Sequence, residues 1–221
     1  MMEKTRFVAG DIRRLFGDID CLLERKLELM MVGGGAMSVR GDKASTKDID
    51  LVFRTESQLQ GFIRALERGG FHEHSRPGLE YRKMSTRVFV DGRGYWLDLF
   101  CERICKAFLV HEGVWGRAEE YLDLDRLRVV LMAPEDIFIS KSITERDGDL
   151  DDMRTMFLKG LDEKLILKEV SFQSEKSPKV WEAFLTVKLE ELEKKFKINV
   201  PFKNKVMRIA EDRMEKMAGK G

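Results

Sequence analysis

Two aspartates that stand two residues apart are the first candidates for chemistry in this sequence. Asp48 and Asp50 flank Ile49, and apolar residues then continue to Phe53, which is typical of a strand. Side chains alternate along a strand, so both carboxylates point to one face while the apolar residues point to the other and into a core. Neighbouring carboxylates repel each other unless a cation lies between them. The pattern predicts a Mg²⁺ site, because Mg²⁺ binds carboxylates together with phosphate oxygens.

A glycine cluster precedes these aspartates. Residues 27–32 form an apolar run with one acidic member, and three glycines come next. Glycines after a strand leave backbone N–H groups bare, so that an anion such as a triphosphate can approach them. We expect Gly33 and Gly34 to bind the nucleotide phosphates. A short helix over 35–40 would add its dipole, and Ser38 is a further candidate for phosphate binding.

A third aspartate stands in a later strand-like run over 95–101. Trp96, Asp98 and Phe100 share one face of this run. A carboxylate among apolar residues is costly to bury without a partner, which is consistent with a metal ligand. By itself Asp98 fits an edge strand that faces water equally well. Only its combination with Asp48 and Asp50 favours the role of third metal ligand.

The spacing of these motifs resembles a known signature. Val32-Gly33-Gly34 is followed, after thirteen residues, by Asp48-Ile49-Asp50. This resembles the nucleotidyltransferase (DNA polymerase β-like) superfamily, and in detail its small prokaryotic members, including abortive-infection-type toxins. One departure concerns the position two before Thr46, where those relatives often carry Arg and this chain has Ala44, next to Lys43.

The resemblance implies a fold and a reaction. The fold would be α+β, with a mixed sheet and a helical C-terminal region. The enzyme would move an NMP from an NTP such as ATP to an acceptor hydroxyl on RNA, for example the tRNA 3′ end, or on protein, and release pyrophosphate. Two Mg²⁺ ions, or Mn²⁺ in their place, would be the cofactors, held by Asp48, Asp50 and Asp98. Asp98 would also help to deprotonate the attacking hydroxyl.

Downstream elements extend the resemblance to the toxin-like subfamily. Pro134-Glu135-Asp136, Lys141 and an acidic stretch over 146–152 match its pattern. By carry-over, Lys141 would contact the nucleotide phosphates and Asp149 would assist catalysis or orient the lysine. The alternative is a solvated helical surface with exposed ion pairs, each contributing under about 1 kcal/mol.

The biological setting has several open alternatives. The resemblance implies a toxin–antitoxin or abortive-infection context, with an antitoxin partner and a homodimer as candidate assemblies. A protein that keeps the fold and binds nucleotide without turnover is the competing interpretation, and Ala44 is the residue that favours it. Retention of all three carboxylates favours an active enzyme.

Composition restricts the partners further. Charged residues make up 36% of the 221 residues, yet the net charge is +1, so nucleic-acid binding requires a local basic patch. The basic run over 194–208 is one candidate, although nearby glutamates favour an ordinary solvated helix. Three cysteines and the lack of a long apolar run predict a cytoplasmic protein without membrane contact.

The remaining periodicity predicts the elements around these motifs. We expect an amphipathic helix over 11–24 with Asp11 as its N-cap, and strands over 81–84, 87–90 and 127–132. Helices dominate after the last strand. The predicted organisation is a nucleotidyltransferase core over 1–132 and a helical region over 133–221.

Overall fold

The computed structural model describes residues 5–74, 87–144, 146 and 148–219. The chain divides into two compact units, Met1–Ala133 and Pro134–Gly221. The strand expected over 81–84 lies outside the described residues. In the part that is described, no helix is long and apolar enough to cross a membrane.

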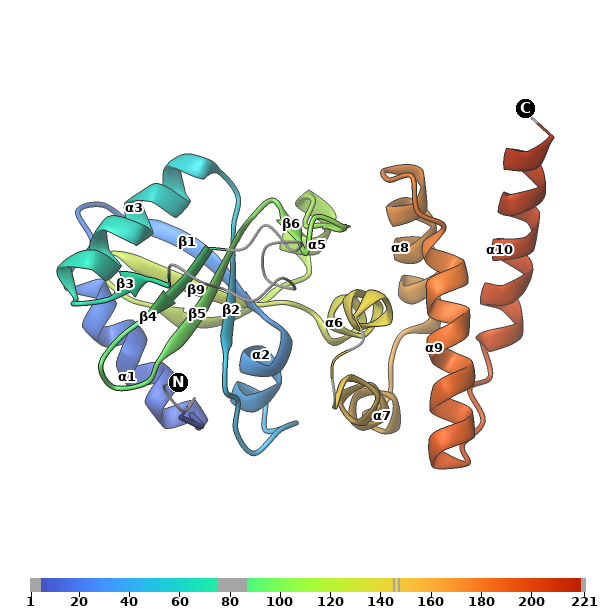
Figure 1. Ribbon diagram of the computed structural model, residues 1–221, viewed down its shortest axis with the longest axis horizontal. Coiled ribbons are helices and arrows are strands. Elements are labelled where there is room, and N and C mark those ends of the chain that lie inside the picture. The colour runs from blue at the N-terminus through green and yellow to red at the C-terminus, as the bar shows by residue number, and fades with distance from the viewer. Residues whose placement is uncertain (1–4, 75–86, 145, 147, 220–221) are drawn as a thin grey trace. The chain divides into compact units, whose positions relative to one another are not determined.

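The first unit is built on a mixed sheet with the strand order β3-β4-β5-β2-β1-β9-β8 (Figure 1). Its strands are β1 (Leu27–Val32), β2 (Ile49–Phe53), β3 (His72–Glu73), β4 (Arg87–Val90), β5 (Trp96–Cys101), β8 (Glu119–Asp123) and β9 (Leu127–Leu131). β2 runs antiparallel to β1, while β2 with β5 and β1 with β9 are parallel pairs. β6 (Arg103–Ile104) and β7 (Phe108–Leu109) form a separate hairpin. The predicted α+β class with a mixed sheet is confirmed.

Helices cover the sheet face that carries the apolar positions of β2. The helices of this unit are α1 (Ala9–Asp20), α2 (Gly33–Val39), α3 (Glu56–Arg68) and α5 (Glu112–Gly116). Figure 1 shows α1 and α3 beside the sheet. The ring of Phe53 on β2 lies 5.1 Å from that of Phe62 on α3, so the predicted apolar face of β2 does point into a core. The opposite face is therefore the one that carries Asp50.

The first helix differs from the expectation at both ends. α1 begins at Ala9 after Val8, and Asp11 lies inside its first turn. The Asp11 carboxylate accepts a hydrogen bond from the Val8 N–H at 3.1 Å. Asp11 thus satisfies a free backbone donor from within the helix, and its prediction as N-cap is wrong. The helix also ends at Asp20, four residues before the predicted end.

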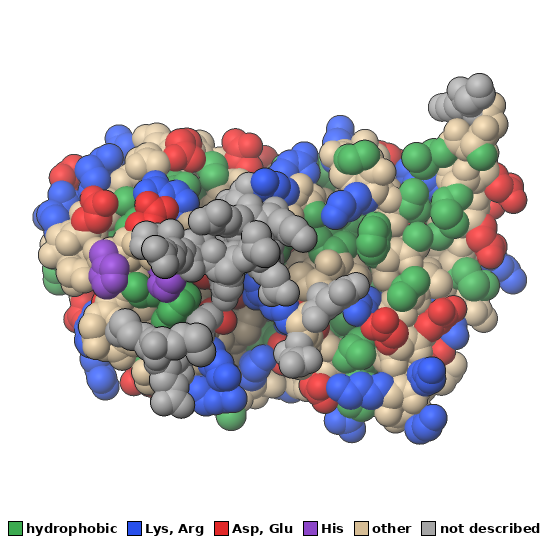
Figure 2. Space-filling model, in the orientation of Figure 1, with side chains coloured by type: hydrophobic (Ala, Val, Ile, Leu, Met, Phe, Trp, Pro, Cys, Tyr) green, Lys and Arg blue, Asp and Glu red, His purple; other side chains and the backbone are tan. Residues whose placement is uncertain are grey.

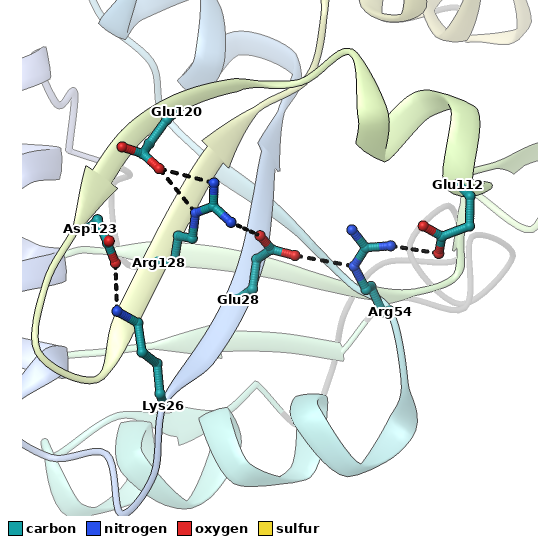
Figure 3. Close-up of polar contacts among 7 residues, drawn as sticks. All are labelled: Lys26, Glu28, Arg54, Glu112, Glu120, Asp123 and Arg128. Atoms are coloured by element: carbon teal, nitrogen blue, oxygen red, sulfur yellow. Dashed lines mark hydrogen bonds and ion pairs between the residues drawn. The ribbon is translucent and has the colours of Figure 1, made fainter.

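An ion-pair network connects β1, β9 and the residue that follows β2 (Figure 3). It lies at the end of β1 opposite to the glycine turn. Glu28 on β1 accepts hydrogen bonds from Arg54 at 3.1 Å and Arg128 at 3.0 Å. Arg54 also contacts Glu112 and lies 4.1 Å above the ring of Trp115. Because Glu28 shares a face with Val32, one sheet face carries this paired network at one end and Asp50 at the other.

The second unit is helical, as expected. It contains α6 (Pro134–Ser140), the 3₁₀ turn η1 (Lys141–Ile143), α7 (Asp149–Lys159), α8 (Glu163–Glu175), α9 (Trp181–Phe196) and α10 (Lys203–Ala218). Trp181 is fully buried and belongs to the core of this unit. Figure 2 shows hydrophobic side chains on one face of the helical unit. Phe184 and Val187 of α9 are 42% and 53% exposed, respectively.

Lysines of the basic run over 194–208 form ion pairs within the second unit. Lys195 contacts Asp151 at 2.8 Å, Lys203 contacts Glu193 at 2.5 Å, and Lys205 pairs with Glu163. A phosphate would have to compete with these carboxylates for the same ammonium groups. The arrangement favours the interpretation of this run as a solvated helical surface over a nucleic-acid grip.

Candidate active site

Asp50 and Asp98 stand side by side on neighbouring strands. β2 and β5 pair in parallel, and their register places Asp50 directly against Asp98. Register partners point to the same face, so the two side chains project together from strands about 4.8 Å apart. Asp98 is fully buried. The interpretation of Asp98 as an edge-strand residue in water is therefore wrong, and the expected neighbourhood of Asp50 and Asp98 is found.

Asp48 immediately precedes β2 and is partly exposed. The Thr46 hydroxyl donates a hydrogen bond of 2.7 Å to the Asp48 carbonyl oxygen. The backbone N–H of Thr46 donates a hydrogen bond to the Phe7 carbonyl, and the Phe7 N–H donates one to the Thr46 carbonyl. These bonds hold the segment that leads into β2. Asp48 thus stands two residues before Asp50, in a segment that these hydrogen bonds hold, and its role as a metal ligand stays a prediction.

The glycine turn lies against Asp50. Val32, the last residue of β1, pairs with Asp50, and α2 starts at once with Gly33. The helix thus begins two residues earlier than expected. Gly33 has a φ of +58°, and a Cβ atom there would lie 2.8 Å from Asp50 Oδ2. Only glycine suits this position, because both the backbone conformation and the adjacent carboxylate oppose a side chain.

Gly34 faces two further polar groups. A Cβ atom on Gly34 would lie 3.0 Å from Thr46 Oγ1 and 3.8 Å from Lys43 Nζ. The glycine turn therefore has an ammonium, a hydroxyl and the Asp50 carboxylate around it. Sequence reasoning did not assign Lys43 a role. Its position beside the departure at Ala44 is the signal that points to it.

Ser38 lies in the last turn of α2 and is 5% exposed. Its hydroxyl oxygen is buried and makes no hydrogen bond within the described residues. A direct contact between this hydroxyl and a phosphate would require the surrounding side chains to move. The role of Ser38 in nucleotide binding stays a prediction.

The carboxylates on β2 and β5 can be compared with the ligands that Mg²⁺ takes in proteins. Among the described residues, no group of three or more His, Cys, Asp or Glu side chains stands ready to hold a metal ion. Mg²⁺ in nucleotide enzymes is commonly held by one or two carboxylates together with substrate phosphates rather than by a cage of protein ligands. Asp50 and Asp98, adjacent in register and beside the bare turn at Gly33, fit that type of site.

A second acidic cluster lies in the helical unit. Lys141 Nζ contacts Asp149 Oδ1 at 2.6 Å and Asp152 Oδ2 at 2.9 Å. Asp149 also accepts hydrogen bonds from the Thr144 hydroxyl and the Arg146 N–H. The three charged side chains are each 10 to 11% exposed. The expected association of Lys141 with Asp149 is present. Asp152 is a third member, which sequence reasoning placed in the acidic stretch over 146–152 without giving it a role.

The charges of this cluster stabilise one another. Burial by itself lowers the pKa of Lys141. The charges of Asp149 and Asp152, together with the hydrogen bonds that Lys141 donates to them, outweigh this effect and raise that pKa above its usual value. Burial likewise raises the pKa of Asp149. The charge of Lys141 and the hydrogen bonds from Lys141, Thr144 and Arg146 outweigh this effect and lower the pKa of Asp149. The folded protein therefore keeps both groups charged at neutral pH.

Comparison with known families agrees with the resemblance drawn from the motifs. Residues 10–197 match the family described as "Nucleotidyltransferase of unknown function (DUF6036)". A comparison with curated proteins found no match. Because the family match covers most of the chain, the protein belongs to this nucleotidyltransferase family.

Proposed function

We propose that this member of the nucleotidyltransferase family transfers an NMP from an NTP to an acceptor hydroxyl on RNA or protein, with Mg²⁺ or Mn²⁺ as the cofactor. The observation that supports the reaction most strongly is the register of β2 and β5, which sets Asp50 beside Asp98 next to the glycine turn. Family membership supports the transferase class. The acceptor, the nucleotide and the metal are parts of the proposal.

The glycine turn and Lys43 bind the triphosphate in this proposal. Gly33 and Gly34 present backbone N–H groups to the phosphate oxygens, because a glycine has no side chain of its own to cover them. Lys43 Nζ, close to Gly34, supplies a positive charge for the same oxygens. Together these groups orient the α-phosphorus toward the carboxylates.

Asp48, Asp50 and Asp98 would hold the metal. When bound, Mg²⁺ neutralises phosphate charge and makes the acceptor hydroxyl more acidic. The Asp98 carboxylate accepts the proton of the acceptor hydroxyl. The acceptor oxygen forms a bond to the α-phosphorus, the bond from that phosphorus to the bridging oxygen breaks, and pyrophosphate leaves.

Lys141 and Asp149 are secondary candidates. Their active-site roles come from the resemblance, in which the lysine contacts phosphate and the acid assists. In this chain Lys141 already contacts two carboxylates. A phosphate role for Lys141 requires it to exchange one of them for the nucleotide, so a structural role in the helical unit is the simpler alternative.

The test is incubation of the purified full chain with each labelled NTP and Mg²⁺, with total tRNA in one reaction and cell protein in another. We expect label to enter one acceptor class, and Asp50→Asn to abolish the transfer. Asp123→Asn, on an exposed acid of β8, is the matched control and should retain it. Equal labelling by wild type and Asp50→Asn would contradict the proposed mechanism.

A nucleotide-binding protein without turnover is the second candidate function. Ala44, at a position where related toxins often carry Arg, is the feature that favours it. This candidate predicts that NTP binds with Mg²⁺ but that neither acceptor becomes labelled. An antitoxin partner and a homodimer remain proposals of either function, and co-purification and the mass of the protein in solution test them.

A further inference from the structure

Helix α9 carries two exposed apolar side chains one turn apart. The helix packs against α7, α8, α10 and η1 within the second unit. Its buried apolar positions are Trp181, Leu185, Leu189 and Leu192. Phe184 and Val187 lie outside this buried face and are 42% and 53% exposed. Because residues three apart are neighbours on a helix surface, the two side chains form one apolar area that burial against another surface would stabilise.

A cavity of about 320 Å³ lies beside this apolar area. Its lining comes from η1 and α9 and consists of Ser142, Ile143, Ala183, Phe184, Val187, Lys188 and Glu191. Four of these residues, at positions 184, 187, 188 and 191, surround a single point on the helix surface because of their spacing. When two helices pack, four such side chains form the hole that receives one side chain of the facing helix. The cavity is therefore suited to a side chain that projects from a helix.

The charges change sign along this side of α9. Lys179 comes just before the helix, and its Nζ lies 5.6 Å from the centre of the Phe184 ring. Glu191 follows two turns after Phe184, and its side chain is 45% exposed. Its Oε2 atom contacts Lys188 Nζ at 2.8 Å. Within the described part of the chain, Glu191 Oε1 accepts no hydrogen bond and Lys179 forms no ion pair. We call Lys179, Phe184, Val187 and Glu191 the α9 stripe, which thus runs from a cation through two apolar residues to an anion.

A stripe with this order of residues is complementary to itself. A two-fold axis between two copies makes their α9 helices antiparallel, so residues from one end of a stripe meet residues from the other end. Phe184 then faces Val187 of the other copy, and Lys179 faces Glu191. Both pairs have their midpoint near residue 185, so a single axis serves both. Opposite charges at such a contact favour this register, whereas a parallel arrangement would set Lys179 against Lys179.

We propose that two copies of the chain associate through their α9 stripes in antiparallel orientation. Phe184 of each copy enters the cavity of the other, between η1 and α9. The Lys179 ammonium of each copy pairs with Glu191 of the other. The inference gives the homodimer a specific interface. It does not depend on the transfer reaction, because all of its residues belong to the helical unit.

The first test is the mass of the purified full chain in solution, measured by sedimentation equilibrium from about 1 μM to 1 mM. We expect a monomer–dimer equilibrium whose dissociation constant rises about tenfold or more in Phe184→Ser. Leu158→Ser is the matched control, since Leu158 on α7 is 59% exposed and does not line the cavity. It should dimerise like the wild type. Urea denaturation of both variants shows that they stay folded.

An exchange of the two charges tests the orientation of the helices. Lys179→Glu and Glu191→Lys should each raise the dissociation constant by about tenfold, because each sets like charges opposite each other twice in a symmetric dimer. The double variant Lys179→Glu/Glu191→Lys should return close to the wild-type value. Glu211→Lys, at an exposed acid of α10, is the control for the change of charge and should leave the dimer unaffected.

Three outcomes would overturn the proposal. A wild-type chain that stays monomeric over the whole range would leave the α9 stripe to a different partner protein. A dimer that Phe184→Ser and Leu158→Ser weaken equally would place the interface elsewhere. If the double variant dimerised no better than the two single variants, the antiparallel pairing of Lys179 with Glu191 would be wrong. None of these measurements uses NMP transfer, so a failure of the proposed reaction would leave their result intact.

Discussion

The two acidic clusters of this protein differ in how their charges are brought together. Asp50 and Asp98 meet because two parallel strands pair in a particular register. Asp149 and Asp152 meet on one helical turn and share the ammonium group of Lys141 at 2.6 and 2.9 Å. The helical cluster thus contains its own cation and hydrogen-bond donors. The strand cluster sets like charges directly opposite each other, which destabilises a sheet.

This difference separates a structural cluster from a functional one. Carboxylates that share a buried ammonium are strongly destabilised when that partner is removed. Carboxylates adjacent in register gain from a cation that arrives with a substrate, so their replacement should affect activity more than stability. The following predictions use this contrast.

Asp98→Asn should have the largest effect on activity. We expect NMP transfer to fall by about 100- to 1,000-fold, as when a group that stabilises transition-state charge is removed. The free energy of unfolding should change little, because asparagine has nearly the same size and shape as this fully buried side chain. Transfer assays together with urea denaturation measure both. If Asp98→Asn kept NMP transfer but lost stability, the proposed difference between the two acidic clusters would be wrong.

Lys141→Met should have the largest effect on stability. It leaves Asp149 and Asp152 without their shared cation, and we expect the free energy of unfolding to fall by about 3–5 kcal/mol. Lys188→Met is the matched control, since the Lys188 side chain is 13% exposed but pairs with the more exposed Glu191. That control should lose under about 1 kcal/mol. Similar losses in both variants, measured by urea denaturation, would argue against a special role for the Lys141 cluster.

Lys43→Met should raise the KM for the NTP by about tenfold, equivalent to about 1.4 kcal/mol, while kcat changes little. The reason is that Lys43 Nζ lies close to Gly34, where the proposed mechanism places the phosphates of the NTP. Lys47→Met removes an exposed lysine from the same loop and should leave KM unchanged. Steady-state kinetics at saturating acceptor measure both constants. If the two variants behave alike, Lys43 has no particular contact with the nucleotide.

The dependence of stability on pH should be the smallest effect. The lowered pKa of Asp149 contributes stability above about pH 3.9, the unfolded value, and this contribution is lost as the pH falls through the folded-state pKa. The raised pKa of Lys141 contributes stability below about pH 10.4, which is lost as the pH rises through its folded-state value. Urea denaturation from acid to alkaline pH should show both losses in the wild type. Asp149→Asn should lack the part of the acid loss that Asp149 contributes, and an unchanged acid profile would contradict the assignment.

The local features of the site could be predicted from the sequence. The alternation around Ile49 and the apolar run before Gly33 predicted the strands, the faces of their side chains and the turn between strand and helix. The register between β2 and β5 could not be derived, because it depends on strands separated by more than forty residues. The expectation that Asp98 lies beside Asp50 came from the resemblance and a chemical argument about burial.

Other parts of the site were decided by tertiary contacts. The position of Lys43 over Gly34 depends on how a polar loop folds back, and polar loops carry no periodicity that predicts their path. Asp152 joins Lys141 only because the turn over η1 brings α7 alongside it. The N-cap prediction at Asp11 failed because Asp11 lies at the third helical position, from which its carboxylate accepts a hydrogen bond from the N–H of the N-cap residue Val8.

The sequence by itself determined the strand and helix types, the glycine turn and the nucleotidyltransferase signature, because these depend on residues close together in the chain. Only the tertiary structure decided which distant residues meet, including Asp50 with Asp98 and Phe53 with Phe62. The physical reason is that contacts between distant residues depend on packing and strand order, which local patterns constrain but do not specify.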